Sequence, residues 1–119
     1  MQKTIKFNVV SSTNIDAENG HSPLKFSLGQ NYPNPFNPGT TIHFTIPVSS
    51  VVSLEIFDML GKKINTLVSG VKPAGEYTIY WDSKDEKMNS VASGIYYYHL
   101  KMEAPGKTQA RTGKMVLMR

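Results

Sequence analysis

Cysteine is absent from the 119 residues, which excludes disulfides, thiolate metal sites and cysteine nucleophiles. Histidine is scarce, because only His21, His43 and His99 are present. His21 falls in a polar connector, and the other two fall in alternating segments where an outward-facing histidine is ordinary. No pair of carboxylates stands out for glycoside cleavage either. We therefore expect a protein that is not an enzyme and that needs no cofactor.

Long apolar runs are also missing. No run approaches the roughly 18 residues that a membrane-spanning helix needs, so we expect no membrane insertion. The first ten residues lack the continuous apolar region of a secretory signal peptide. We expect either a protein that is not exported by itself or the end of a longer chain to which Met1 was added.

Charge of one sign is not concentrated anywhere. The net charge of +4 comes from scattered lysines, and only Lys62-Lys63 and the tail residues Arg111, Lys114 and Arg119 are grouped. Nucleic-acid binders usually gather basic residues on one face together with aromatic platforms, so we expect no nucleic-acid partner. A scattered basic surface favours solubility or weak attraction to anionic surfaces.

Proline, in contrast, is concentrated in residues 31–39. Pro33, Pro35 and Pro38 restrict φ to about −65° and make the preceding residues extended, which excludes a helix. A semi-rigid linker is one interpretation. Because an alternating strand follows without a break, we instead expect a rigid lead-in that places Tyr32 and Phe36 against the core.

Short alternating segments with intervening turns occupy the rest of the chain, and no ten-residue stretch has helical periodicity. A turn at Gly61 joins two of them into a hairpin. The expected inward faces are Val52, Leu54 and Ile56; Tyr77, Ile79 and Trp81; and Tyr96, Tyr98 and Leu100. The expected strands are 40–46, 51–58, 63–68, 76–81, 94–102 and 112–118, with a further short one at 4–10.

About seven short strands predict an all-β protein, an antiparallel β-sandwich, with a closed barrel as the alternative. Residues 1–22 are expected to form a strand and a flexible connector, and residues 23–119 the folded domain. The strand at 4–10 could end a preceding domain, form an edge of this one or pair with a neighbouring copy.

Two segments suggest ligand binding. The acidic loop at 82–90 could hold calcium, but Lys84 and Lys87 interrupt it, so we interpret it as a turn and expect no metal. Tyr80 and Tyr97 fall on faces opposite the expected core, where they could stack on a sugar. Cross-strand aromatic pairing is the alternative explanation.

Several motifs in order carry a family resemblance: Tyr32-Pro33-Asn34-Pro35-Phe36-Asn37-Pro38, the strand Val52 to Asp58 with Leu60-Gly61-Lys62-Lys63, then Ala74-Gly75, Trp81-Asp82 and Ala92-Ser93-Gly94-Ile95-Tyr96. Over residues 26–119 the chain resembles the type A C-terminal sorting domain of type IX secretion (Por secretion) cargo, and also the immunoglobulin-like domain of flagellar hook-capping proteins. The basic-apolar ending Lys114 to Arg119 favours the sorting domain.

The resemblance implies an Ig-like β-sandwich that directs a secreted cargo protein to the cell surface. Its implied partners are the type IX outer-membrane machinery, a sortase-like peptidase that cleaves near residues 20–26, and a cargo domain upstream in the same chain. The proline motif is then a scaffold for a signal read mainly at the terminal strand. The implied structural residues are Tyr32, Pro33, Asn34, Pro35, Phe36, Gly61, Gly75, Trp81 and Gly94.

Recognition is expected at Lys114, Met115, Val116, Leu117 and Arg119. Lys114 and Arg119 would be exposed contacts, whereas Met115 and Leu117 would pack inward. Two alternatives remain: a self-associating module that forms extracellular fibres by strand exchange, and a carbohydrate-binding accessory module that uses Tyr80 or Tyr97.

Overall fold

The computed structural model describes residues 24–119, so the expected strand at 4–10, the connector and His21 lie outside the described residues. The described chain contains strands, turns and loops, and none of its residues is helical. Within it, no helix could cross a membrane. The strands are β1 (Ser27–Leu28), β2 (Thr40–Ile46), β3 (Ser50–Asp58), β4 (Lys63–Lys72), β5 (Gly75–Trp81), β6 (Gly94–Ala104) and β7 (Lys107–Leu117).

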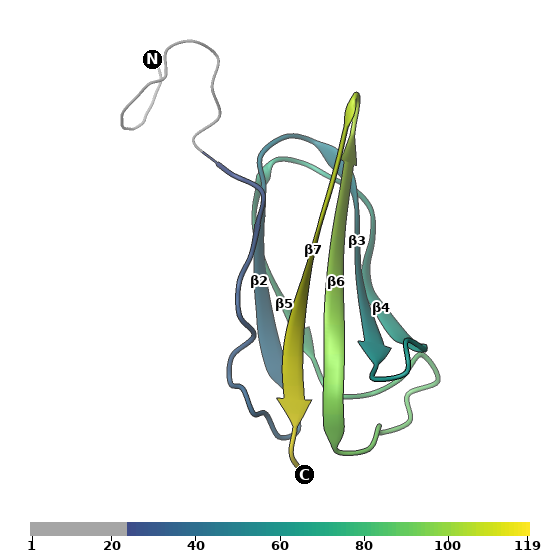
Figure 1. Cartoon of the computed structure of the whole chain (residues 1–119). Coiled ribbons are helices and arrows are strands. Elements are labelled where there is room, and N and C mark those ends of the chain that lie inside the picture. The colour runs from purple at the N-terminus through teal and green to yellow at the C-terminus, as the bar shows by residue number, and fades with distance from the viewer. Residues whose placement is uncertain (1–23) are drawn as a thin grey trace.

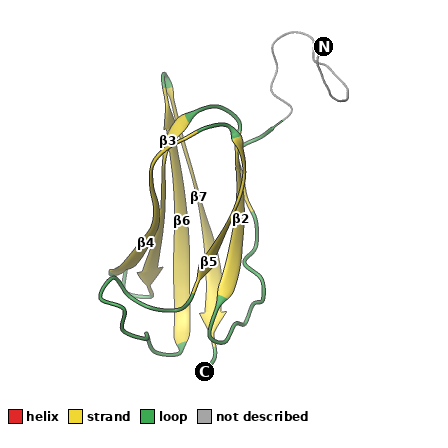
Figure 2. Cartoon of the chain, turned by 180° about the vertical axis from the view of Figure 1, so that it is seen from behind, coloured by secondary structure: helices red, strands yellow, loops and turns green. Residues whose placement is uncertain are grey.

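Two antiparallel sheets face each other (Figures 1 and 2). The smaller sheet has the strand order β1-β2-β5, and the larger has the order β4-β3-β6-β7. The predicted Ig-like sandwich is therefore confirmed. The closed-barrel alternative is wrong, because the strands form two separate sheets.

The core lies between the sheets and follows from the alternation of apolar residues. The inward positions of β2 and β3 are completely buried, as the sequence predicts. Aromatic rings pack within this core. The ring centroids of Trp81 in β5 and Tyr96 in β6 are 5.7 Å apart and join the two sheets, and those of Phe44 and Tyr77, which are paired within the smaller sheet, are 5.2 Å apart. The largest fully buried side chains are Trp81, Tyr98, Phe36, Phe44, Ile42, Ile46, Leu54, Ile56, Leu100, Met102, Met115 and Leu117.

Two strands extend beyond their predicted ends. β4 continues past Val68 to Lys72, because Ser69 and Gly70 stay paired with Ser53 and Val52 of β3. The connection between the expected strands 63–68 and 76–81 is therefore reduced to Pro73 and Ala74. β7 begins at Lys107 rather than at residue 112. Its first half carries mostly exposed polar residues, so it has no apolar alternation from which a strand could be predicted.

Gly113 of β7 is opposite Tyr98 of β6, and the Tyr98 ring occupies the space that a side chain at position 113 would need. A β-carbon on Gly113 would lie 2.1 Å from Cζ of Tyr98. The ring cannot move away easily, because its hydroxyl group is hydrogen-bonded to Gly29 and Asn31. This strand residue is therefore under steric constraint although it lies outside every predicted motif.

We expect Gly113→Ala to lower the free energy of unfolding by about 1–3 kcal/mol, the usual cost of overpacking. Urea unfolding followed by circular dichroism measures it. In a Tyr98→Leu background, which replaces the ring with a shorter side chain that lacks the clashing atoms, the same substitution should cost much less. An equal cost in both backgrounds would show that the clash with Tyr98 is not the cause.

Candidate functional site

The proline segment, residues 31–39, connects the two sheets. At one end Tyr32 pairs with Thr41 of β2, through N–O distances of 2.9 and 2.8 Å. At the other end Phe36 forms a parallel bridge with Leu117 of β7. The Phe36 N–H group donates to the Val116 carbonyl oxygen (2.9 Å), and the Met118 N–H group donates to that of Phe36 (3.0 Å). The segment thus covers the end of the β7 edge.

The proline motif and the terminal strand are therefore a single structural unit, which we call the junction (residues 31–39 with 114–119). Asn34 strengthens it, because its Oδ1 accepts the Val116 N–H group at 3.0 Å. Figure 1 shows the C-terminus beside the loop that precedes β2. The expectation that the motif is a scaffold for a signal read mainly at the terminal strand stays a prediction, and the motif is hydrogen-bonded to that strand.

Phe36 and Tyr32 take opposite orientations. Phe36 is buried, with its ring centroid 5.8 Å from that of Trp81, so its predicted packing is confirmed. The prediction for Tyr32 is wrong, because its side chain is 79% exposed. Neighbouring residues of an extended chain point to opposite sides, and here Asn31 points inward and is 1% exposed. The peptide bonds that precede Pro33, Pro35 and Pro38 are cis.

Polar groups buried at the junction have partners. Asn31 Nδ2 donates to Thr40 Oγ1 (3.0 Å) and to the Pro33 carbonyl oxygen (3.2 Å). The Tyr98 hydroxyl group accepts the Asn31 N–H group (3.1 Å) and donates to the Gly29 carbonyl oxygen (2.9 Å). Burial raises the pKa of the Tyr98 phenol, so it stays neutral and remains a donor. β6 thereby fixes the start of the proline segment.

The terminal residues divide into inward and outward sets. Met115 and Leu117 are buried in the core, whereas Lys114 and Met118 are exposed and Val116 is half-buried. Inward packing at positions 115 and 117 and exposure at 114 agree with the sequence-based prediction. A role of these residues in recognition stays a prediction.

Arg119 is exposed, yet its side chain is held in place. Its Nε donates to the Val91 carbonyl oxygen (2.8 Å) and its Nη2 to Ser83 Oγ (2.8 Å). Its main-chain N–H group donates to Ser93 Oγ (3.0 Å). Arg119 therefore fastens the end of the chain to the β5–β6 loop, in addition to any outward contact. The sequence contains no local signal for this attachment.

The acidic loop at 82–90 forms a turn. Asp85 Oδ1 accepts the N–H groups of Asn89 and Lys87, both at 2.9 Å. These two hydrogen bonds hold the pKa of the Asp85 carboxyl below its usual value, and the bond from Asn89 has the larger effect. The interpretation as a turn is confirmed. Nowhere in residues 24–119 do three or more histidine or acidic side chains gather as a metal site would require.

Of the remaining predicted residues, Gly94 and Tyr97 of β6 pair with Leu117 and Lys114 of the junction, whereas Gly61 and Gly75 lie in other parts of the fold. Gly75 and Gly94 begin β5 and β6, and Gly61, with φ of 84°, closes the β3–β4 turn as predicted. Tyr97 lines an open pocket of about 410 Å³ on the outer face of the larger sheet. The other lining residues are Phe57, Asp58, Met59, Gly61, His99 and Thr112.

The chemistry of this pocket is limited. His99 Nδ1 lies 2.8 Å from Thr112 Oγ1. The Asp58 carboxylate serves the turn, because its Oδ1 accepts the N–H groups of Leu60 and Lys62, both at 2.9 Å. Each of these polar side chains therefore already has a partner within the protein.

A known family model matches part of the chain. The model of the FlgD Ig-like domain matches residues 36–106, which run from Phe36 to the β6–β7 turn and exclude β7. No curated protein matches the chain. The match supports the Ig-like part of the predicted resemblance, and the assignment to sorting domains stays a prediction.

Solved structures share the fold. The chain is similar to dimeric latent PorU from Porphyromonas gingivalis (TM-score 0.66, 20% identity), over 87% of this chain and 10% of PorU. It is similar to FLGD from P. aeruginosa (TM-score 0.54, 28% identity), over 66% of this chain and 60% of FLGD. A likeness to PorZ, described as an essential bacterial surface component of the type-IX secretion system of P. gingivalis, has a TM-score of 0.49 and 22% identity, over 79% of this chain and 11% of PorZ.

Proposed function

The chain belongs to the FlgD Ig-like domain family, and from this premise we propose that it is a non-catalytic C-terminal sorting and anchoring domain. It directs a secreted cargo protein through the type IX secretion system to the cell surface. Its partners are the outer-membrane secretion machinery, a sortase-like peptidase and the cargo domain upstream in the same chain.

The junction is the observation that carries this proposal. The proline motif and the basic-apolar ending are the two features on which the resemblance to sorting domains depends most. They lie far apart in the sequence, and in the fold Phe36 and Leu117 are paired. A segment that covers the last residues of the terminal strand prevents that end of the strand from pairing with other chains.

The exposed side of the junction suits recognition by a partner. Lys114 and Met118 project outward while Met115 and Leu117 hold the strand in the core. A receptor could therefore read the outer side chains without unfolding the domain. The likeness to PorU, in which the matched part is 10% of the chain, supports a small module carried by a much larger protein.

A reporter fusion tests the proposal. Residues 1–119 are attached to the C-terminus of a reporter with a signal peptide, in a bacterium that has type IX secretion. We expect the reporter at the cell surface or in the medium. Lys114→Glu, which reverses the charge at the junction, should reduce the surface signal severalfold.

The control for charge is Lys107→Glu, an exposed lysine at the far end of the same strand, which should leave export unchanged. Proteolysis of the purified domains verifies that both variants are folded. Retention of the unmutated fusion in the periplasm would overturn the proposal, and equal export of both variants would exclude Lys114 from the recognised surface.

A further inference from the structure

Two exposed tyrosines flank one residue on the outer face of the smaller sheet. Thr41 of β2 pairs with Tyr32 on one side and with Tyr80 of β5 on the other. Directly paired residues of neighbouring antiparallel strands project to the same face. Tyr32 is 79% exposed and Tyr80 is 62% exposed. We call Tyr32, Thr41 and Tyr80 the tyrosine row.

Neither tyrosine ring contributes to aromatic packing. In the described part of the chain, the ring pairs are Phe36–Trp81, Phe44–Tyr77 and Trp81–Tyr96, and neither Tyr32 nor Tyr80 belongs to them. Cross-strand aromatic pairing, the alternative explanation for Tyr80, is therefore not what is observed. These two large rings are left in solvent, where they contribute little to folding.

Gly39 gives Tyr80 its position. A β-carbon on Gly39 would lie 1.8 Å from the Tyr80 hydroxyl oxygen, so the end of the ring occupies the space of the missing side chain. Gly39 and Thr41 are two residues apart in the chain, on the same side of an extended segment. The Tyr80 ring therefore leans along the face of the sheet instead of standing away from it.

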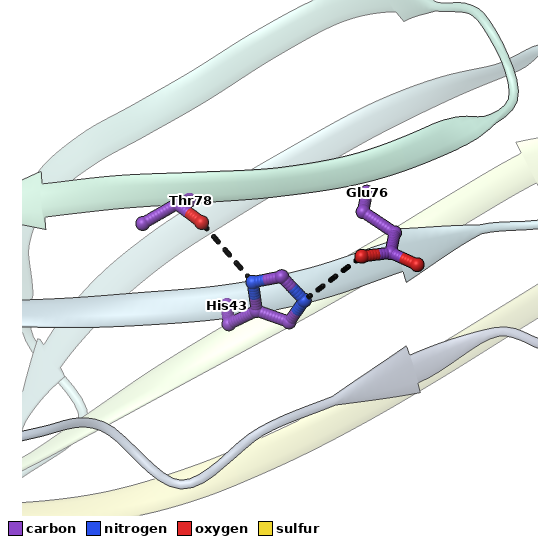
Figure 3. A network of polar contacts seen from close by, with 3 residues as sticks. All are labelled: His43, Glu76 and Thr78. Atoms are coloured by element: carbon purple, nitrogen blue, oxygen red, sulfur yellow. Dashed lines mark hydrogen bonds and ion pairs between the residues drawn. The ribbon is translucent and has the colours of Figure 1, made fainter.

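Hydrogen-bonding groups form the next row of the same face. His43 pairs with Thr78, and His43 Nδ1 lies 3.1 Å from Thr78 Oγ1. His43 Nε2 lies 3.8 Å from Glu76 Oε1. Figure 3 shows the imidazole between the hydroxyl and the carboxylate. The His43 side chain is 51% exposed, so the ring can still contact a ligand.

From this arrangement we propose that the outer face of the smaller sheet binds a neutral polysaccharide. Sugars have apolar C–H faces that stack on tyrosine rings and hydroxyl edges that pair with imidazole, hydroxyl and carboxylate groups. Tyr32 and Tyr80 lie on either side of β2, two strand spacings or ~10 Å apart, which suits consecutive sugar units of an extended chain.

The charge of the face decides against a nucleic acid. Neither row contains a lysine or an arginine, and Glu76 would repel phosphate groups. The site also differs from the one expected from the sequence, since Tyr97 lies on the larger sheet and only Tyr80 belongs to this face. The proposal does not depend on the sorting function.

Affinity electrophoresis of the full chain tests this site. Native gels contain hydroxyethyl cellulose, xylan, mannan or soluble starch as neutral probes, and migration is compared with a gel that lacks polysaccharide. We expect retardation by at least one probe. Tyr32→Ala and Tyr80→Ala should each weaken binding by roughly two- to tenfold, the contribution of one aromatic contact.

Matched variants identify the face. Tyr80→Phe keeps the ring and should keep most of the binding, and Tyr97→Ala, on the other sheet, should bind like the unmutated chain. Circular dichroism verifies that each variant is folded. Absence of retardation by every probe would overturn the proposal, as would equal binding by Tyr97→Ala and the Tyr32→Ala/Tyr80→Ala double variant.

Analytical ultracentrifugation of the same samples tests whether this face binds a second copy of the chain instead of a polysaccharide. If the unmutated chain dimerises, the double variant is monomeric and no polysaccharide retards either, the face is an interface between copies and the carbohydrate proposal is wrong.

Discussion

Replacing Phe36 with alanine is expected to lower the free energy of unfolding by about 3–5 kcal/mol, the cost usually found for truncating a buried phenylalanine. Phe36 is 1% exposed and packs on Trp81. Its main chain is also paired with β7 through two hydrogen bonds. Loss of the ring should therefore remove core packing and loosen the junction together. A domain of this size has only about 5–15 kcal/mol of total stability, so the variant will be close to unfolding.

Tyr32→Ala is the matched control, because it removes an aromatic side chain of similar size from the same segment. Its 79% exposure predicts a change of no more than about 0.5 kcal/mol. Urea denaturation followed by far-ultraviolet circular dichroism measures both variants. Similar losses at positions 32 and 36 would contradict the orientations in the structure, because only one of the rings is in the core.

These two residues show what the sequence could predict. The prolines correctly exclude a helix, and the alternation in β2 and β3 correctly identifies their buried faces. The side on which each residue of the proline segment would lie could not be predicted, because a segment paired only through isolated bridges has no regular period. Hydrophobicity suggested that both aromatic rings are buried, but only Phe36 is.

Contacts between distant residues account for most of what the sequence did not reveal. The Tyr98 hydroxyl group and the Asn31 N–H group are 67 residues apart, and Arg119 and Ser83 are 36 residues apart. Neither pair follows from a local pattern, because the partners meet only when both sheets are in place. The sequence motifs located both halves of the junction without showing that they form one site.

Trp81→Ala is expected to have an effect of similar size, about 3–5 kcal/mol, because the ring fills the core between Phe36 and Tyr96. Its Nε1 also donates to the Lys84 carbonyl oxygen at 2.9 Å, so the β5–β6 loop should loosen as well. Trp81→Phe separates the two contributions. It keeps a smaller aromatic ring and loses the N–H donor, and the Lys84 oxygen still accepts a hydrogen bond from Asn65 Nδ2.

The phenylalanine variant should therefore cost far less than the alanine variant, about 1–2 kcal/mol for one lost hydrogen bond and imperfect packing. Circular dichroism is the suitable probe, since Trp81 is the sole tryptophan and both variants lack its fluorescence. Arg119 also binds Ser83 and Val91 of the β5–β6 loop. Amide hydrogen exchange at residues 83–93 reports whether this loop loosens, and it should increase more in the alanine variant than in the phenylalanine variant. Unchanged exchange there would mean that Arg119 and Asn65 hold the loop without the indole.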